Sequence, residues 1–149
     1  MNELPGEGTS GREITIRRLR GGDEDVLAEL ATQQGKGDPH GLLADVRTLM
    51  LVAFDGEAPV GFVLAHELPR RHGARAKLFV YEIDVADSHR RRGIGSALLA
   101  RLAGLARERG IPAGFVLTEP DNDPANALYR RVGGTSSTVV QWDFQYAAD

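Results

Sequence analysis

Residues 78–96 read LFVYEIDVADSHRRRGIGS, and the fold prediction rests on this stretch. Its first eight residues are mostly apolar or aromatic, which favours a β-strand over residues 78–85. A helix is predicted from residue 94, because apolar side chains recur three or four positions apart at Ile94, Leu98, Leu102 and Leu105. Gly110 and Pro112 can end that helix. The stretch therefore predicts a strand, a short turn and a helix.

The rest of the chain predicts a sheet with helices packed on it. The other predicted strands span residues 14–19, 49–54, 60–68, 113–118 and 137–146. The other predicted helices span residues 23–34, 41–47 and 123–132, and Asp123 is expected to be the N-cap of the last of them. Asp55-Gly56-Glu57 is a hairpin turn signal, so the strands on either side of it should be antiparallel. We predict one α/β (α+β) domain over residues 12–149, with a mixed and largely antiparallel central sheet, after a flexible leader of residues 1–11.

Composition narrows the class of protein. The chain has 149 residues, 42% hydrophobic and 26% charged, as in an ordinary globular domain. It has no cysteine, which excludes disulfides and a thiolate metal site, and we predict no metal centre. No apolar run approaches the roughly 20 residues of a membrane span, and the first residues lack a signal-peptide pattern. We therefore expect a cytoplasmic protein with no membrane partner.

The turn after residue 85 has the features of an anion site. Helix N-termini present free N–H groups and a partial positive charge, and glycines such as Gly93 and Gly95 let a phosphate approach the backbone. Three arginines precede them at positions 90–92. The glycine spacing alone leaves a solvated basic turn as an equal alternative. Neither a P-loop nor a dinucleotide fingerprint fits the spacing.

Three short patterns occur in register around this turn. Arg90, Gly93 and Gly95 match Gln/Arg-x-x-Gly-x-Gly/Ala. Glu82 stands three residues before Val85, the last apolar residue of the predicted strand. The third pattern, Asn-x-x-Ala-x-x-x-Tyr followed by a glycine, is matched by Asn122, Ala125, Tyr129 and Gly133. Together these patterns, over roughly residues 49–144, resemble the GNAT superfamily of N-acetyltransferases.

This resemblance implies acetyl-CoA as the cofactor. The backbone amides of residues 91–96 would bind the CoA pyrophosphate, while the Val85 backbone and the Asn122 side chain would hydrogen-bond the pantetheine arm. The cofactor-binding residues that it implies are Val85, Arg90, Arg91, Arg92, Gly93, Ile94, Gly95, Ser96 and Asn122.

The resemblance also implies two catalytic residues, and the chemistry agrees with them. Direct acetyl transfer requires a base to remove a proton from an ammonium group and a donor to protonate the leaving thiolate. Glu82 suits the first role and Tyr129 the second. A carboxylate with an ordinary pKa is a poor base at neutral pH, so we expect partial burial, a neighbouring acid such as Asp84, or a route through a water molecule. A solvent-facing or ion-paired Glu82 and a core Tyr129 are the structural alternatives.

A closer resemblance concerns the acceptor. The segments at residues 80–91, 123–129 and 142–144 are similar to the GNAT-type aminoglycoside 3-N-acetyltransferases, which act on the 3-amino group of the deoxystreptamine ring in gentamicin-like antibiotics. The resemblance implies acceptor binding by Glu82, Glu119, Asp123 and Asp143. Clustered acids also suit a polycationic amine. In this sequence, Glu82 stands where those enzymes tend to have aspartate and Asp84 where a small residue is usual.

Other functions stay open at this point. A protein or peptide N-terminal acetyltransferase would need an open groove, and an aminoglycoside enzyme an enclosed acidic pocket. A small-polyamine acetyltransferase and a non-catalytic acyl-CoA-binding module are further alternatives. A nucleic-acid partner is not expected, because neither interleaved aromatics nor a recognition helix accompanies the arginines. A homodimer is conceivable, with the aromatic strand at residues 137–146 as its contact.

Overall fold

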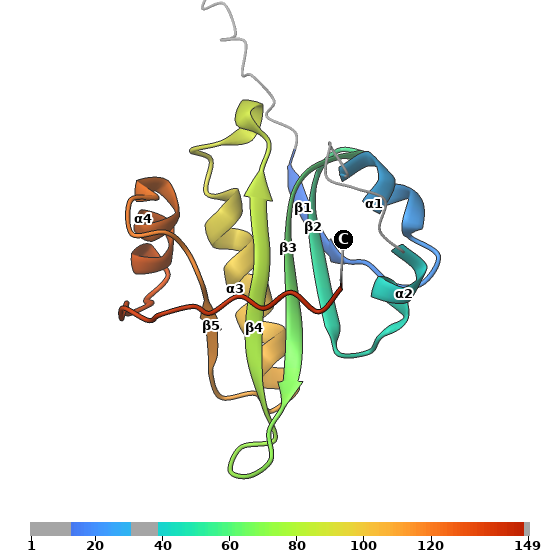
Figure 1. The fold of residues 1–149 in the computed structure, drawn as a ribbon. Coiled ribbons are helices and arrows are strands. Elements are labelled where there is room, and N and C mark those ends of the chain that lie inside the picture. Colours follow the sequence, from blue (N-terminus) through green and yellow to red (C-terminus); the bar gives the residue numbers. More distant parts are fainter. Residues whose placement is uncertain (1–12, 31–38, 148–149) are drawn as a thin grey trace, which may run out of the picture.

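A computed structural model describes residues 13–30 and 39–147 of the chain. Its centre is a sheet of five strands in the order β1-β2-β3-β4-β5 (Figure 1). The pairs β1–β2, β2–β3 and β3–β4 are antiparallel, and β5 runs parallel to β4. The strands are β1 (Ile14–Arg18), β2 (Thr48–Asp55), β3 (Ala58–Pro69), β4 (Ala76–Val85) and β5 (Gly114–Val116).

Helices cover both faces of the sheet. One face packs against α3 through residues such as Leu51, Val63 and Leu98, and the other packs against the first two helices through Val52, Leu64 and Leu43. Strand β2 is buried on both faces, since every residue from Thr48 to Phe54 is buried. The helices are α1 (Glu24–Leu30), α2 (Pro39–Ala44), the 3-10 turn η1 (Asp87–His89), α3 (Ile94–Glu108) and α4 (Asp123–Arg131).

This architecture confirms the predicted fold class, a mixed and largely antiparallel sheet with flanking helices. The strand, turn and helix predicted from residues 78–96 are all present. The predicted leader at residues 1–11 and the end of the first helix at residues 31–34 lie outside the described residues. None of the helices in the described ranges is long and apolar enough to cross a membrane.

The strand predicted at residues 137–146 is wrong. This segment has no strand structure, and its side chains are exposed, Trp142 at 78% and Phe144 at 70%. Figure 1 shows the segment running across the strands of the sheet instead of beside one of them. Alternating apolar residues are typical of a strand, but a strand also needs a neighbour that pairs with its N–H and C=O groups. The segment has no such neighbour in the described structure.

A β-bulge interrupts β4 where it pairs with β3. Leu64 lies opposite Glu82 while the next residue, Ala65, lies opposite Val80, so Tyr81 is an extra residue with no partner. An extra residue shifts the alternation of side chains between the two faces. Before the bulge Val80 faces α3, and after it Ile83 and Val85 do. Glu82 is therefore turned to the face opposite α3.

Both ends of α3 are fixed against the sheet. At its start, the buried Ile94 packs over Gly61, where a Cβ would come within 3.1 Å of the Asp84 carbonyl oxygen and 3.5 Å of Ile94 Cγ2. At its other end, the Arg109 guanidinium donates to the carboxylate of Glu67 on β3 and to the Val46 carbonyl. Glu67 is 6% exposed, so this ion pair is a buried one.

The Glu67 ion pair predicts a measurable loss of stability. Burial by itself raises the pKa of Glu67, but the hydrogen bond and charge of Arg109, and then those of Arg75, leave this pKa below its ordinary value. The ionised carboxylate therefore stabilises the fold above about pH 4.3, and this contribution is lost as the pH falls through the lowered pKa. We expect Glu67→Ala to reduce the free energy of unfolding by about 3 kcal/mol at pH 7 in urea titrations, because Arg109 is left unpaired.

Arg75 provides the matched control for this measurement. Its side chain is 75% exposed although it also contacts Glu67, so Arg75→Ala should cost less than about 1 kcal/mol. Equal losses in the two variants would contradict the assignment of the stabilisation to the Arg109 pair.

Candidate active site

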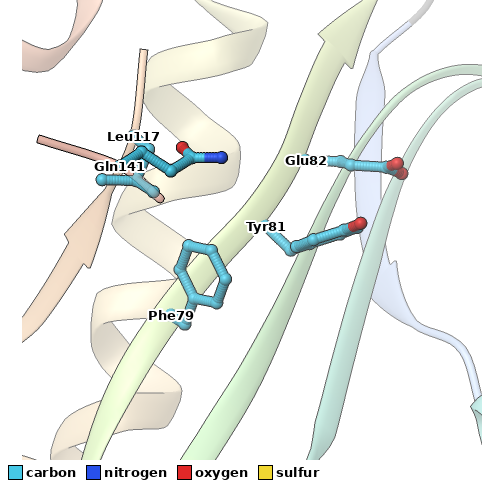
Figure 2. A pocket seen from close by; sticks show the side chains of 5 residues that line it. All are labelled: Phe79, Tyr81, Glu82, Leu117 and Gln141. Atoms are coloured by element: carbon cyan, nitrogen blue, oxygen red, sulfur yellow. The ribbon is translucent and has the colours of Figure 1, made fainter. Parts of the chain in front are cut away.

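A cleft lies on the face of the sheet opposite α3, over the bulge in β4. Its volume is about 550 Å³, and it is lined by Phe79, Tyr81, Glu82, Leu117 and Gln141. Figure 2 shows Tyr81 and Glu82 extending from β4 to one side, with Leu117 and Gln141 on the other. Because Gln141 lines this cleft, the segment after α4 passes over β4 at this point.

Aromatic rings form the floor of the cleft. Phe79 stacks on Phe115 of β5 with ring centroids 4.7 Å apart, and Tyr81 meets Phe79 edge to face at 5.7 Å. His66 of β3 contacts Tyr81 from the other side, also at 5.7 Å. Tyr81 is 57% exposed, so its ring is available to a ligand. Such a surface suits a molecule with an apolar ring face, while Glu82 suits a cation.

Glu82 lines this cleft as an exposed side chain. The expected partial burial is therefore absent from the structure. The neighbouring acid is present. Asp84 pairs with Phe62 of β3 as Glu82 pairs with Leu64, so the two carboxylates lie on the same face of the sheet. A cation placed in the cleft would meet the Glu82 carboxylate and the aromatic rings of Phe79 and Tyr81.

The turn that leads into α3 has the geometry of an anion site. Arg91 and Gly93 both have left-handed backbones, with φ of 62° and 75°. The first hydrogen bond of α3 runs from the Ala97 N–H to the Gly93 carbonyl, so the N–H groups of Ile94, Gly95 and Ser96 precede it. Nothing lies within 4 Å of the Cβ position of Gly93, which leaves the backbone open to a ligand.

The charges around this turn are only partly neutralised. Arg90 folds back onto the end of β4, where it pairs with Asp84 and Asp87 at 3.5 and 3.1 Å. Arg91 and Arg92 are exposed, and neither forms an ion pair within the part of the chain that the structure describes. The turn thus carries two uncompensated cations beside its open amides.

Val85 directs its backbone away from β3. It is opposite Gly61, and the Ala86 N–H donates to the Val60 carbonyl, so Val85 is at a non-hydrogen-bonded position of the ladder. Its N–H donates to Asp84 Oδ1 at 2.9 Å, and its carbonyl accepts from Arg90 Nε at 3.1 Å. A ligand that uses this backbone must therefore displace both side chains.

Helix α4 begins at a cap different from the one that the sequence suggests. An Asp123-Pro124 start favours Asp123 as the N-cap, but Asn122 fills this position, and its side-chain oxygen accepts from the Ala125 N–H at 3.2 Å. The oxygen of Asn122 is thus already engaged, which leaves its amide N–H₂ for a ligand. A side-chain oxygen in that position satisfies one of the free N–H groups at the helix start.

Tyr129 lies on α4 and is partly buried. Burial raises the pKa of its hydroxyl, which therefore keeps its proton at neutral pH. The preceding residue, Leu128, packs on the turn: a Cβ at Gly95 would be 3.1 Å from Leu128 Cδ2. Leu128, which lies within the third sequence pattern, is thus held against Gly95 of the first pattern.

The structure does not gather the predicted acidic residues in one place. Of Glu82, Glu119, Asp123 and Asp143, only Glu82 lines the cleft, and the other three are exposed elsewhere. Asp143 accepts a hydrogen bond from Gln141, which does line the cleft. The substrate-binding role of these acids stays a prediction.

Sequence reasoning missed the aromatic floor, although the sequence contains a signal for it. Apolar residues occupy even positions at Leu78 and Val80 and odd positions at Ile83 and Val85, and this change of phase marks the bulge.

A second cleft of about 680 Å³ beside α3 has a mostly apolar lining and includes Ser96 but neither predicted catalytic residue.

These features define a class of protein: a small α/β domain with an anion-binding turn at the end of one strand and an exposed carboxylate in a cleft on that same strand. The chain belongs to the Acetyltransferase (GNAT) family, whose profile matches residues 19–134. GNAT acetyltransferases use acetyl-CoA.

One relative in this family is streptothricin acetyltransferase from Streptomyces lavendulae, which is 34% identical over 120 residues. The match covers 78% of this chain but 61% of that protein, so the chain spans less than two thirds of this relative.

Solved structures share the fold. An aminoglycoside acetyltransferase from an uncultured soil metagenomic sample, in complex with sisomicin, superposes with a TM-score of 0.83 at 20% identity, covering 90% of this chain and 97% of that one. A second aminoglycoside acetyltransferase from such a sample has a TM-score of 0.79 at 26% identity, covering 91% of this chain and 99% of that one.

The turn fits the phosphates of acetyl-CoA. Its open amides, the empty space at Gly93 and the uncompensated Arg91 and Arg92 are the groups that a pyrophosphate needs. The Ser96 hydroxyl at the start of α3 is buried and has no hydrogen-bond partner among the described residues.

The cap at Asn122 predicts a loss of stability in a variant that removes its acceptor oxygen and none in a variant that keeps it. Asn122→Ala should lower the free energy of unfolding by about 1 kcal/mol, because the Ala125 N–H loses its acceptor. Asn122→Asp keeps an acceptor oxygen and should preserve stability in the same urea titration. An equal loss in both variants would show that the cap is not the source of the effect.

Proposed function

We propose that this chain is an acetyl-CoA-dependent N-acetyltransferase that acetylates an amino group of an aminoglycoside, the 3-amino group of the deoxystreptamine ring. One observation carries the proposal: the bulge at Tyr81 turns Glu82 into a cleft on the strand that ends at the anion-binding turn. A base for the amine and a site for the acetyl donor therefore share one strand.

The residues of this chain divide the chemistry between them. Bound acetyl-CoA supplies the thioester whose carbonyl carbon the amine attacks. Glu82 accepts the proton that leaves the ammonium group, directly or through a water molecule, and a C–N bond forms as the C–S bond breaks. The Tyr129 hydroxyl, which stays protonated at neutral pH, donates a proton to the departing sulfur. The second proton that the nitrogen loses as the amide forms passes to solvent, from which Tyr129 is reprotonated. Val85 and Asn122 bind the pantetheine arm, after Asp84 and Arg90 release the Val85 backbone.

The choice of acceptor is supported by the cleft and by the relatives. Phe79 and Tyr81 offer flat apolar surfaces to a ring, and Glu82 offers a charge to its ammonium group. One relative is named for streptothricin and one solved structure for aminoglycosides, and the proposal carries this class of acceptor over to the present chain. Antibiotic resistance would follow from it.

A second candidate is a peptide or protein N-terminal acetyltransferase. The sequence predicts an enclosed acidic pocket for an aminoglycoside enzyme, but Glu82 is the single acid among the described residues that line this cleft. The lining residues Tyr81 and Leu117 are 57% and 48% exposed, so the cleft is open. An open cleft of this kind also admits an extended chain.

Thiol release distinguishes these candidates. Purified protein with acetyl-CoA should release free CoA on addition of gentamicin, and far less on addition of spermidine or of a lysine-bearing peptide with a free N-terminus. Spermidine is the control for charge without a ring. Preference for the peptide would replace the proposal with the second candidate, and NMR of the product would identify the acetylated amine.

Glu82→Gln tests the base directly. We expect kcat to fall by about 100-fold or more while KM for acetyl-CoA stays within about twofold, because the variant loses a proton acceptor and leaves the turn intact. Glu57→Gln, at an exposed turn, is the matched control and should behave as the wild type. Unchanged turnover in Glu82→Gln would assign the base to another group.

Three further expectations from the sequence stay predictions. They are the cytoplasmic location, the homodimer and the binding of the acceptor by Glu119, Asp123 and Asp143.

A further inference from the structure

We infer that His89 is a positioning residue that sets the conformation of the acetyl-CoA turn by joining it to Asp55. The inference rests on the proposed function only in taking residues 91–96 as the acetyl-CoA site. His89 belongs to none of the three sequence patterns, and it is not part of the acceptor cleft.

The imidazole of His89 connects two distant parts of the chain. Its Nε2–H donates to Asp55 Oδ2 at 2.9 Å, across 34 positions in the sequence, because an ionised carboxylate only accepts. Its Nδ1 lies 2.7 Å from Ser88 Oγ, whose hydroxyl donates to it when the ring is neutral. The His89 and Asp55 side chains are 17% and 25% exposed, so the contact is largely shielded from water.

The contact lies immediately before the acetyl-CoA turn in the chain. Asp55 ends β2, at the hairpin to β3, and His89 ends η1, two residues before Arg91. Arg91 has a left-handed backbone, which is unfavourable for a residue with a side chain and persists only where neighbours hold it. The buried Ile94 holds the turn on its C-terminal side. His89 holds it on the N-terminal side.

A turn fixed in advance binds its ligand more tightly than one that must be ordered on binding. Loss of the contact with Asp55 should therefore weaken acetyl-CoA binding. It should not change the acceptor cleft, since Glu82 and Tyr81 are set by the pairing of β4 with β3. This separation of the two sites is an effect that a general loss of structure would not produce.

Two conservative substitutions separate the two hydrogen bonds of His89. His89→Gln places an amide N–H₂ near the position of Nε2 and keeps a donor for Asp55, whereas His89→Asn places one near Nδ1 and loses that donor. We expect His89→Asn to raise KM for acetyl-CoA, and the Kd of CoA in calorimetry, by about fivefold to tenfold, with kcat and KM for gentamicin unchanged. His89→Gln should restore most of this affinity.

His72→Asn, in the exposed loop between β3 and β4, is the matched control and should bind CoA as the wild type does. A lowered kcat with unchanged CoA affinity in His89→Asn, or equal defects in the Asn and Gln variants, would overturn the inference. Because CoA binding is measured without an acceptor, the inference is tested even if gentamicin is not acetylated. A wild-type protein that fails to bind CoA would instead overturn the proposed function, and this inference with it.

Discussion

The extra residue at Tyr81 is the constraint on which the arrangement of the site depends. A regular β4 would place Glu82 on the face covered by α3, among apolar side chains, where an unpaired carboxylate is costly. The bulge reverses the alternation after Val80, so Glu82 and Asp84 turn outward while Ile83 and Val85 enter the core. It also adds a ring to the cleft, since Tyr81 packs against Phe79 and His66. One inserted residue thus supplies both the carboxylate and part of the surface beside it.

The rest of β4 links this cleft to the anion-binding turn. The strand ends at Val85, whose backbone N–H and C=O point away from β3. The chain then passes through η1 to Arg91 and Gly93, which both have a left-handed backbone conformation. Beyond the turn, α3 is anchored by Ile94 at its start and by the ion pair of Arg109 with Glu67 at its end. The same strand and the same helix therefore fix the cleft and the turn relative to each other, as the proposed acetyl transfer would require.

Elements that have a local sequence pattern could be predicted, whereas features that depend on contacts between distant segments could not. The spacing of apolar residues in 94–105 predicts α3, and the glycines and arginines before it predict the turn. In contrast, the pattern of residues 137–146 predicts a strand that the structure does not contain, because local alternation does not specify a pairing partner. The contact of His89 with Asp55 joins residues 34 positions apart, and no local signal indicates it. The acids at Glu119, Asp123 and Asp143 likewise do not line the cleft.

Gly61 limits how the protein can change over evolutionary time. Any side chain at this position would press on Asp84, Val85 and Ile94, which are the residues that align the end of β4 with the start of α3. The lining residues Tyr81, Leu117 and Gln141 are exposed, and substitutions at exposed positions usually cost little stability. Substitutions in the lining of the cleft are therefore tolerated more readily than a side chain at position 61.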